Sequence, residues 1–201
     1  MTPDDAATNN VTFCPASKLS FDPRPQLAAL FVDGFYNDLK HFSKDKAKLA
    51  AAFTPAFLLD TFFVALGPNN NVLAMVGCPD LNPALELNRD EFTTQLGPWR
   101  GRLAYHLLMK FLIDHSYPFE VKPGTGSIEY VVADPAIRGK GITGRLIEYV
   151  MHQRGYAKYV LEVASTNTRA VKLYQRLGFK EFMRKPAPKQ SGVGDYAYMS
   201  R

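Results

Sequence analysis

One stretch constrains this sequence more than any other. It is a glycine-rich basic segment, IRGKGITGRL, which follows a predicted strand and opens a predicted helix. The apolar run Ile128 to Ala133 predicts a buried strand that ends at Asp134-Pro135, and apolar spacing predicts an amphipathic helix from about Ile142. A helix N-terminus behind a glycine-rich loop offers unpaired N–H groups and the positive end of the helix dipole. The arrangement is typical of a site that holds phosphate groups.

Two common phosphate-binding loops fit this segment poorly. The P-loop pattern GxxxxGK[ST] is absent, because the glycine-lysine pair is followed by another glycine. The dinucleotide pattern GxGxxG can be placed on Gly139, Gly141 and Gly144, and Glu162 stands where its acidic partner is expected. Arg138 and the sequence after the next strand argue against a dinucleotide site, which stays open as an alternative.

Two motifs in the last third of the chain carry a family resemblance. The first, R/Q-x-x-G-x-G/A, matches Arg138 and Gly141, with Thr143 where glycine or alanine is usual. The second, N-x-x-A-x-x-L-Y-x-x-x-G-F, matches the run from Asn167 to Phe179. The motifs occur in this order with a predicted strand, Lys158 to Val163, between them. The segment therefore resembles the GNAT family of N-acetyltransferases.

The resemblance implies a fold and a set of site residues. The fold is α/β, with a GNAT-like mixed, mostly antiparallel sheet flanked by helices. In the family, the loop binds the pyrophosphate of acetyl-CoA, and backbone groups at the end of the preceding strand hold the pantetheine arm and polarise the acetyl carbonyl. Carried over to this sequence, the cofactor-binding positions are Val131, Val132, Ala133, Arg138, Gly139, Lys140, Gly141, Ile142, Thr143, Gly144 and Asn167. Tyr174 matches the residue that commonly acts as general acid at the sulfur.

These residues also have purely structural interpretations. The loop can be an ordinary strand-to-helix turn with solvated basic residues. Tyr174 can be a core tyrosine beside Leu173 and Leu177. Asn167 can be only the N-cap of the predicted helix Thr168 to Leu177, a role worth ~1 kcal/mol. The sequence alone leaves both kinds of role open for each of them.

Glu129 is the lone acid in the apolar strand before the loop. A carboxylate is costly to bury without a role or a partner. We therefore predict that Glu129 helps to deprotonate the acceptor amine, directly or through a water molecule. The competing interpretation is that Glu129 lies at the solvated end of the strand and pairs with a nearby cation.

Composition limits the remaining possibilities. A length of 201 residues and an apolar fraction of 46% suit a single domain over residues 1–201, with an acetyl-CoA-binding core at 127–181. The net charge of +5 is not gathered in runs, so no nucleic-acid partner is expected. The two cysteines and four histidines lack ligand spacing, so no metal is expected. Residues 1–10 predict a disordered tail rather than a signal peptide, and no segment is long enough to span a bilayer, so we expect a cytoplasmic protein without a membrane partner.

Periodicity and turn residues predict the elements outside the motifs. The first half is expected to contain a strand at Val11 to Cys14, helices within Leu19 to Tyr36 and Lys44 to Phe53, and a hairpin of Thr61 to Leu66 with Asn71 to Gly77. The end of the chain is expected to form an antiparallel pair, Phe179 to Met183 with Asp195 to Met199, joined by a mobile loop at Pro186 to Gly194.

Residues 79–126 form the segment least like the family, and we interpret it as a helical insertion before the central strand. It predicts a short helix, Asp90 to Leu96, and a longer one, Trp99 to Ile113. The longer helix carries an apolar stripe of Leu103, Leu107, Leu108, Phe111 and Leu112. One interpretation is a helical pair that caps the sheet. The other is a lid that shapes the acceptor pocket, lined by Trp99, Tyr105 and Tyr117, and we expect the segment to decide the acceptor.

The predicted function is transfer of an acetyl group from acetyl-CoA, as acyl-donor substrate, to a primary amine of a small molecule or a peptide. A homodimer is compatible with the sequence. A non-catalytic acyl-CoA-binding or sensing module is the alternative, and a basic nucleic-acid-binding protein is a further one.

Overall fold

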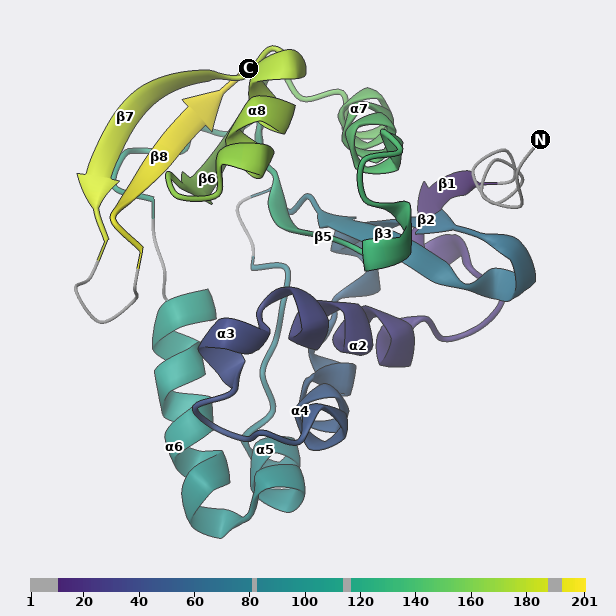
Figure 1. Ribbon diagram of the computed structural model, residues 1–201, viewed down its shortest axis with the longest axis vertical. Coiled ribbons are helices and arrows are strands. Elements are labelled where there is room, and N and C mark those ends of the chain that lie inside the picture. Colours follow the sequence, from purple (N-terminus) through teal and green to yellow (C-terminus); the bar gives the residue numbers. More distant parts are fainter. Residues whose placement is uncertain (1–10, 81–82, 114–116, 188–192) are drawn as a thin grey trace.

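The strands form two four-stranded sheets, in the orders β1-β2-β3-β5 and β4-β6-β8-β7 (Figure 1). The computed structural model describes residues 11–80, 83–113, 117–187 and 193–201. The strand pair β4–β6 is parallel, and the other pairs in this part of the chain are antiparallel. The predicted mixed, mostly antiparallel fold is therefore confirmed. The sequence had not indicated that the sheet is divided in two.

The elements follow the chain order expected from the sequence. The strands are β1 (Thr12–Pro15), β2 (Phe62–Leu66), β3 (Val72–Gly77), β4 (Thr125–Ser127), β5 (Glu129–Ala133), β6 (Lys158–Ala164), β7 (Lys180–Pro186) and β8 (Asp195–Ser200). The helices are α2 (Arg24–Gly34), α3 (Tyr36–Leu39), α4 (Lys46–Phe53), α5 (Arg89–Leu96), α6 (Pro98–Leu108), α7 (Ile142–Arg154) and α8 (Thr168–Arg176). The predicted tail at 1–10 and most of the predicted loop between β7 and β8 lie outside the described residues.

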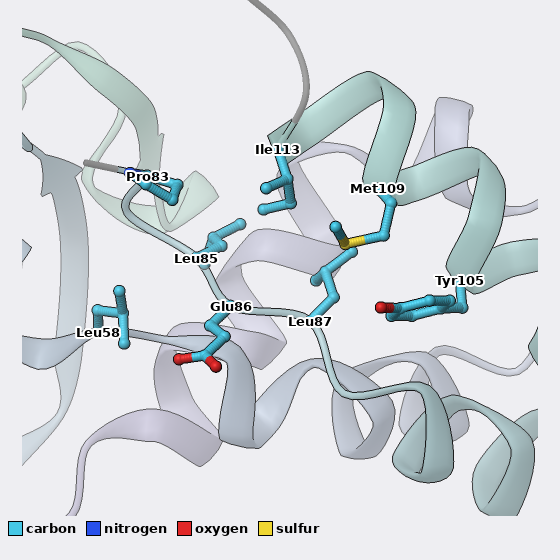
Figure 2. Close-up of a pocket in the computed structure, with 8 residues that line it drawn as sticks. All are labelled: Leu58, Pro83, Leu85, Glu86, Leu87, Tyr105, Met109 and Ile113. Carbon is cyan, nitrogen blue, oxygen red and sulfur yellow. The ribbon is translucent and has the colours of Figure 1, made fainter. Parts of the chain in front are cut away.

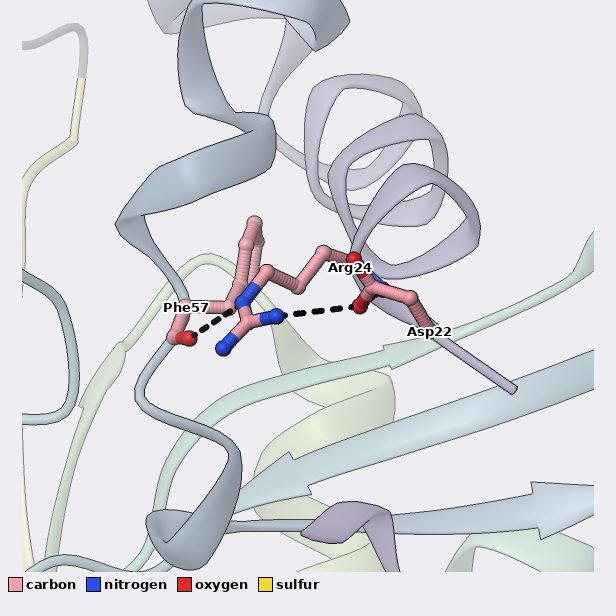
Figure 3. Close-up of polar contacts among 3 residues, drawn as sticks. All are labelled: Asp22, Arg24 and Phe57. Atoms are coloured by element: carbon pink, nitrogen blue, oxygen red, sulfur yellow. Dashed lines mark hydrogen bonds and ion pairs between the residues drawn. The ribbon is translucent and has the colours of Figure 1, made fainter. Parts of the chain in front are cut away.

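Helix α2 packs on the first sheet through the apolar spacing seen in the sequence. Leu27 and Phe31 are buried, and the Phe31 ring centre lies 4.8 Å from that of Phe53. The helix start is fixed by Arg24, whose Nε donates to the Phe57 carbonyl at 3.3 Å (Figure 3). Its Nη1 pairs with the Asp22 carboxylate at 3.2 Å. These contacts tie the first turn of α2 to the segment that leads into β2.

Two apolar cores lie on opposite faces of the first sheet. One core joins that sheet to α2, α4, α5 and α6, with Phe53, Phe62 and Phe92 among its fully buried side chains. The other joins it to α7, α8 and the second sheet, with Ile142 and Leu146 at its centre. Figure 1 shows the same division, with α7 and α8 on one side of β3 and β5 and the helices α2 to α6 on the other.

The insertion contains the two predicted helices, and both contribute to the core beneath the first sheet. Helix α5 packs on α4, and α6 packs on α5 and continues as a π-helical turn, Met109–Ile113. The single apolar stripe predicted on the longer helix is wrong, because the helix has two apolar sides. Leu108 is buried in the core, whereas Leu103 and Phe111 are more than half exposed. Helical spacing marks apolar positions, but the sequence does not say which side meets the core.

Gly101 sets how closely α5 and α6 approach, and replacing it with alanine is expected to destabilise the protein. A Cβ at this position would overlap the Phe92 carbonyl and lie 2.5 Å from Thr93 Cα. Alanine gains about 1 kcal/mol in helix propensity. Overpacking against backbone, which cannot rotate away, costs about 1–3 kcal/mol or more. We expect Gly101→Ala to lower the free energy of unfolding by about 2 kcal/mol in urea denaturation.

The matched control is Gly194→Ala, because a Cβ there meets no atom of a described residue within 4 Å. Its free energy of unfolding should change by less than about 0.5 kcal/mol. If both variants unfold at the same urea concentration, the close approach of α5 and α6 is not a determinant of stability.

Candidate active site

The two sheets separate at the start of the predicted strand Ile128 to Ala133, which the structure shows as β5. The preceding strand, β4, pairs in parallel with β6, whereas β5 pairs antiparallel with β3. Ile128 N donates to Val160 O at 2.9 Å, the last bond between the sheets before they diverge. Tyr130 follows with a left-handed backbone (φ 48°), and the register with β3 shifts at this point. Such a conformation is strained for a non-glycine residue, and it marks a β-bulge that turns the strand away from β6.

The edge of β5 beyond the bulge faces the gap between the sheets. Asp134 N donates to Leu73 O at 2.8 Å, so the peptide groups of Asp134 point toward β3. Peptide groups alternate in direction along an antiparallel strand. The Val132 peptide groups therefore also point toward β3, while those of Val131 and Ala133 point into the gap. Of the three strand residues predicted to hold the donor, two present backbone groups to the gap and Val132 contributes a buried side chain.

The edge of β6 faces the same gap from the other side. Val160 accepts the bond from Ile128, which shows that its peptide groups point toward the first sheet. By the same alternation, the peptide groups of Glu162 and Ala164 point into the gap. Strand edges of this kind suit an extended ligand with amide groups, which can bind by adding peptide-like hydrogen bonds to each edge.

The glycine-rich loop lies at the end of β5, as predicted. Gly139 and Gly141 have left-handed backbones (φ 85° and 76°), and α7 begins at Ile142. A Cβ on Gly141 would meet no atom within 4 Å, so the space in front of the loop is open. Five backbone N–H groups make no hydrogen bond with any described residue: those of Gly139, Gly141, Ile142, Thr143 and Gly144. Unpaired amides at the start of a helix are suited to binding an anion.

The charges around the loop differ in part from those expected. Arg138 is exposed at the loop, as predicted. The Arg145 guanidinium instead lies over the Phe13 ring, 5.3 Å from its centre. Arg169, in the first turn of α8, places its Nη2 3.9 Å from the Cβ position of Gly139. Sequence reasoning missed Arg169, although it stands two residues after the motif asparagine.

Helix α8 lies close against α7, which brings the second motif to the loop. A Cβ on Gly144 would lie 3.3 Å from Leu173 Cδ1, so the glycine allows the close approach. Asn167 is the N-cap of α8, and its Oδ1 accepts from Ala170 N at 3.1 Å. The predicted capping role is therefore confirmed. The Asn167 amide nitrogen is left at the exposed helix end as a donor, and its contact with the acyl donor stays a prediction.

Tyr174 lies on the buried side of α8, in the core between the helices and the second sheet. Only 6% of the residue is exposed, and its ring packs 6.0 Å from that of Phe179. Burial raises the pKa of Tyr174 above its usual value. The hydroxyl has no hydrogen-bond partner among the described residues, and it is not among the fully enclosed polar atoms. Tyr174 is thus a core residue by its ring, with a protonated hydroxyl that is not committed to another group.

Glu129 lies at the start of β5, where the sheets divide, and it takes part in a chain of hydrogen bonds. Ser127 Oγ donates to Glu129 Oε1 at 2.6 Å, and the Tyr117 hydroxyl bonds to Ser127 Oγ at 2.5 Å. Burial and the nearby Glu129 charge raise the pKa of Tyr117 and of Tyr130. Both phenols therefore stay protonated and act as donors. The carboxylate therefore has a hydroxyl neighbour in a half-buried place, and both interpretations of Glu129 made from the sequence stay predictions.

The insertion reaches this carboxylate through one of its three predicted lining residues. Tyr117 begins the hydrogen-bond chain, and its ring lies 6.3 Å from that of Tyr198 on β8. Trp99 is 84% exposed, and among the described contacts it touches none of the three residues in this chain of hydrogen bonds. The Tyr130 hydroxyl donates to Leu112 O at 3.1 Å, which fixes the end of the insertion's longer helix to β5.

Tyr105 lines a separate apolar cavity of about 300 Å³ beneath the insertion (Figure 2). The other lining residues are Leu58, Pro83, Leu85, Glu86, Leu87, Met109 and Ile113. All but Leu58 belong to the predicted insertion. The cavity is therefore formed mostly by the insertion, and none of its lining residues belongs to β5 or β6.

In the described part of the chain, no cluster of His, Cys, Asp or Glu is placed to hold a metal ion. Over the same residues, no helix is long and apolar enough to cross a membrane.

The structure thus combines a split sheet, a glycine loop with unpaired amides and a capped helix beside that loop. The model of the acetyltransferase (GNAT) family matches residues 36–179. The chain therefore belongs to the GNAT acetyltransferase family. This membership supports an acyltransferase activity. The match spans the insertion as well as both motifs.

Solved structures share the fold at low sequence identity. An N-acetyltransferase from Staphylococcus aureus Mu50 is 19% identical with a TM-score of 0.60, over 90% of this chain and 96% of that one. A putative phosphinothricin N-acetyltransferase is 15% identical with a TM-score of 0.56, over 96% and 98%. An uncharacterized protein of Mycobacterium leprae is 32% identical over 89 residues, which is 44% of this chain. This chain spans 23% of that protein's length.

Proposed function

We propose that the protein transfers an acetyl group from acetyl-CoA to a primary amine. The observation that carries this proposal is the continuity of two binding features, the unpaired amides of the glycine loop and the open edge of β5. Membership of the family supports an acyltransferase activity. The two binding features favour acyl-CoA as the acyl donor. Release of free thiol from acetyl-CoA in the presence of amines tests the proposal.

The donor would be held by backbone more than by side chains. The pyrophosphate would accept from the amides between Gly139 and Gly144, with Arg138, Lys140 and Arg169 supplying positive charge. The amide-bearing pantetheine arm would lie along the gap, bonded to the peptide groups of Val131 and Ala133. Asn167 would add its side-chain amide at the helix end. No metal is needed to hold the donor in this scheme.

The chemistry of acyl transfer assigns roles to the remaining groups. Acetyl-CoA supplies an acyl group activated as a thioester, which a neutral amine can attack. Backbone N–H groups of β5 that face the gap would stabilise the negative charge that develops on the carbonyl oxygen. Tyr174 would give its proton to the departing sulfur, since burial keeps the phenol protonated at neutral pH.

Glu129 is proposed to take the proton from the acceptor amine, and this role predicts a change in the pH–rate profile. Amines have a pKa near 10, so at low pH nearly every acceptor molecule is protonated and needs a base. We expect Glu129→Gln to lower kcat most at low pH and to approach wild-type turnover as the pH rises. Acetyl-CoA affinity should be unchanged, because the residue is not part of the loop.

The matched control is Glu148→Gln, which removes one exposed carboxylate from α7. It should leave the profile as in the wild type. An unchanged profile for Glu129→Gln would remove this residue from the mechanism and leave it a structural partner of Ser127.

We further propose that the insertion contributes to the choice of acceptor. Tyr117 belongs to the insertion and bonds to the serine that bonds to Glu129, so it reaches the proposed base. Complete removal of residues 79–126 would not test this, because Phe92, Ala104 and Leu108 are buried in the core. The acceptor side is therefore best probed by point changes around Tyr117.

A further inference from the structure

Helix α6 presents a stripe of large apolar side chains to solvent. The exposed fractions of Trp99, Leu103, Leu107 and Phe111 are 84%, 58%, 37% and 59%. Their spacing of four residues places them along one side of the helix, which lies at the margin of the molecule (Figure 1). Among the described residues, the other exposed large apolar side chain is Phe182. Apolar residues gathered on one surface, rather than scattered singly, indicate an interaction site.

A basic groove runs beside this stripe. Its volume is about 520 Å³, and it lies between α6 and the loop that follows α3. The lining residues are Lys40, His41, Phe42, Ser43, Lys44, Arg100 and Leu103. No acidic residue lines the groove, and Lys40, Lys44 and Arg100 form no ion pair in the described part of the chain. Leu103 belongs to both features, so the groove and the stripe form one continuous surface, here called the α6 surface.

The charge of α6 argues against a second copy of this chain seated face to face on the same surface. From Pro98 to Ile113 the sequence contains Arg100, Arg102 and Lys110 and no acidic residue. A two-fold symmetric contact would place these like charges opposite one another. Juxtaposed like charges disfavour a complex.

The shape of the surface argues against an anionic bilayer. A membrane-surface helix presents its apolar side outward, with basic residues flanking a convex face. Here the loop at Lys40 to Lys44 stands beside α6 and makes the basic part concave. A flat bilayer cannot place its phosphates inside that groove while it also covers the stripe.

We propose that the α6 surface docks an acidic amphipathic segment of another protein. Apolar side chains of the segment would cover the stripe, and its carboxylates would enter the groove to pair with Lys44 and Arg100. The stripe from Trp99 to Phe111 covers thirteen residues, whose ends lie ~18 Å apart along a helix, and this length corresponds to three or four turns of a docked helix. This proposal is independent of the proposed acetyl transfer, because no residue of the α6 surface belongs to the glycine loop, β5, β6 or α8.

Trp99 makes the test direct, because it is the only tryptophan in the sequence and it lies on the stripe. The full chain is titrated with a synthetic acidic amphipathic peptide of about four helical turns, with leucines on one side and glutamates flanking them. We expect a saturable blue shift of Trp99 emission and an affinity that falls as salt rises. A peptide with lysines in place of the glutamates should give no shift.

Variants separate specific docking from general attraction to a basic protein. Lys44→Glu with Arg100→Glu should weaken peptide binding about tenfold or more. Lys18→Glu with Lys180→Glu makes the same change of net charge at exposed residues elsewhere and should bind as the wild type. All four positions are exposed, and thermal unfolding checks that each variant is folded.

Three outcomes would overturn the proposal. The first is that the acidic peptide gives no shift of Trp99 emission, or that the two double charge-reversal variants weaken peptide binding equally. The second is a shift only with vesicles that contain anionic lipid, which would make the surface a membrane contact. The third is a shift that depends on protein concentration without any peptide, with a dimer in sedimentation, which would make it a contact between copies.

Discussion

Replacing Tyr174 with phenylalanine is expected to lower kcat by ~10²-fold or more, the usual scale of general acid catalysis, with acetyl-CoA affinity nearly unchanged. Phenylalanine keeps the ring that packs on Phe179. The hydroxyl has no partner among the described residues, so no internal hydrogen bond is broken and folding stability should be kept. What the substitution removes is the proton that burial holds on the phenol at neutral pH.

The loss should shrink with an acyl donor whose leaving thiol has a lower pKa, because that thiolate departs without a proton. Tyr149→Phe serves as the matched control, since this tyrosine packs on Phe13 from α7. It should leave kcat unchanged. If the Tyr174 variant is less stable but turns over normally when folded, Tyr174 is a core residue only and the acid is another group.

Replacing Gly141 with glutamate is expected to reduce acetyl-CoA affinity by about 100-fold or more, the loss of two charge-assisted hydrogen bonds. The side chain would enter the open space in front of the unpaired amides, and its carboxylate would occupy the place of a phosphate. The left-handed backbone at this residue adds a strain of about 1–2 kcal/mol to the folded state. Calorimetric titration with acetyl-CoA measures the affinity, and thermal unfolding measures the strain.

The variant Gly155→Glu separates the effect of backbone strain from the effect of blocking the glycine loop. Gly155 ends the same helix with φ 62°, and a Cβ there also meets no atom within 4 Å. The two variants therefore carry the same charge and a similar strain at opposite ends of α7. Gly155→Glu should lose comparable stability and bind acetyl-CoA like the wild type. Equal affinity in both variants would mean that the loop does not hold the donor.

The parts of the site that were predictable are those fixed by local chemistry. Gly141 and Ile142 mark the start of α7, because a left-handed residue is needed there and few residues other than glycine adopt it. Asn167 caps α8, as its place before an apolar helix indicated. Each motif lies within a single strand-loop-helix unit. The order of residues in the sequence was therefore enough to predict most of the local geometry.

The parts that were not predictable depend on contacts between distant segments. Ser127 and Glu129 share one side of a strand, which period-two spacing could have revealed, but Tyr117 reaches them from the insertion. Arg169 replaces Arg145 beside the loop because α8 folds back against α7. The split of the sheet depends on the left-handed backbone of Tyr130, a residue type that gives no local signal for it.

The central claim is that this chain holds acetyl-CoA in the glycine loop and transfers its acetyl group to an amine. The most direct measurement follows thiol release from acetyl-CoA over a broad panel of primary amines, with mass spectrometry of each amine. We predict release matched by acetylated product for at least one class of amine, and its loss in Gly141→Glu. Tight binding of acetyl-CoA with no thiol release for any amine would contradict catalysis and leave a non-catalytic acyl-CoA-binding module.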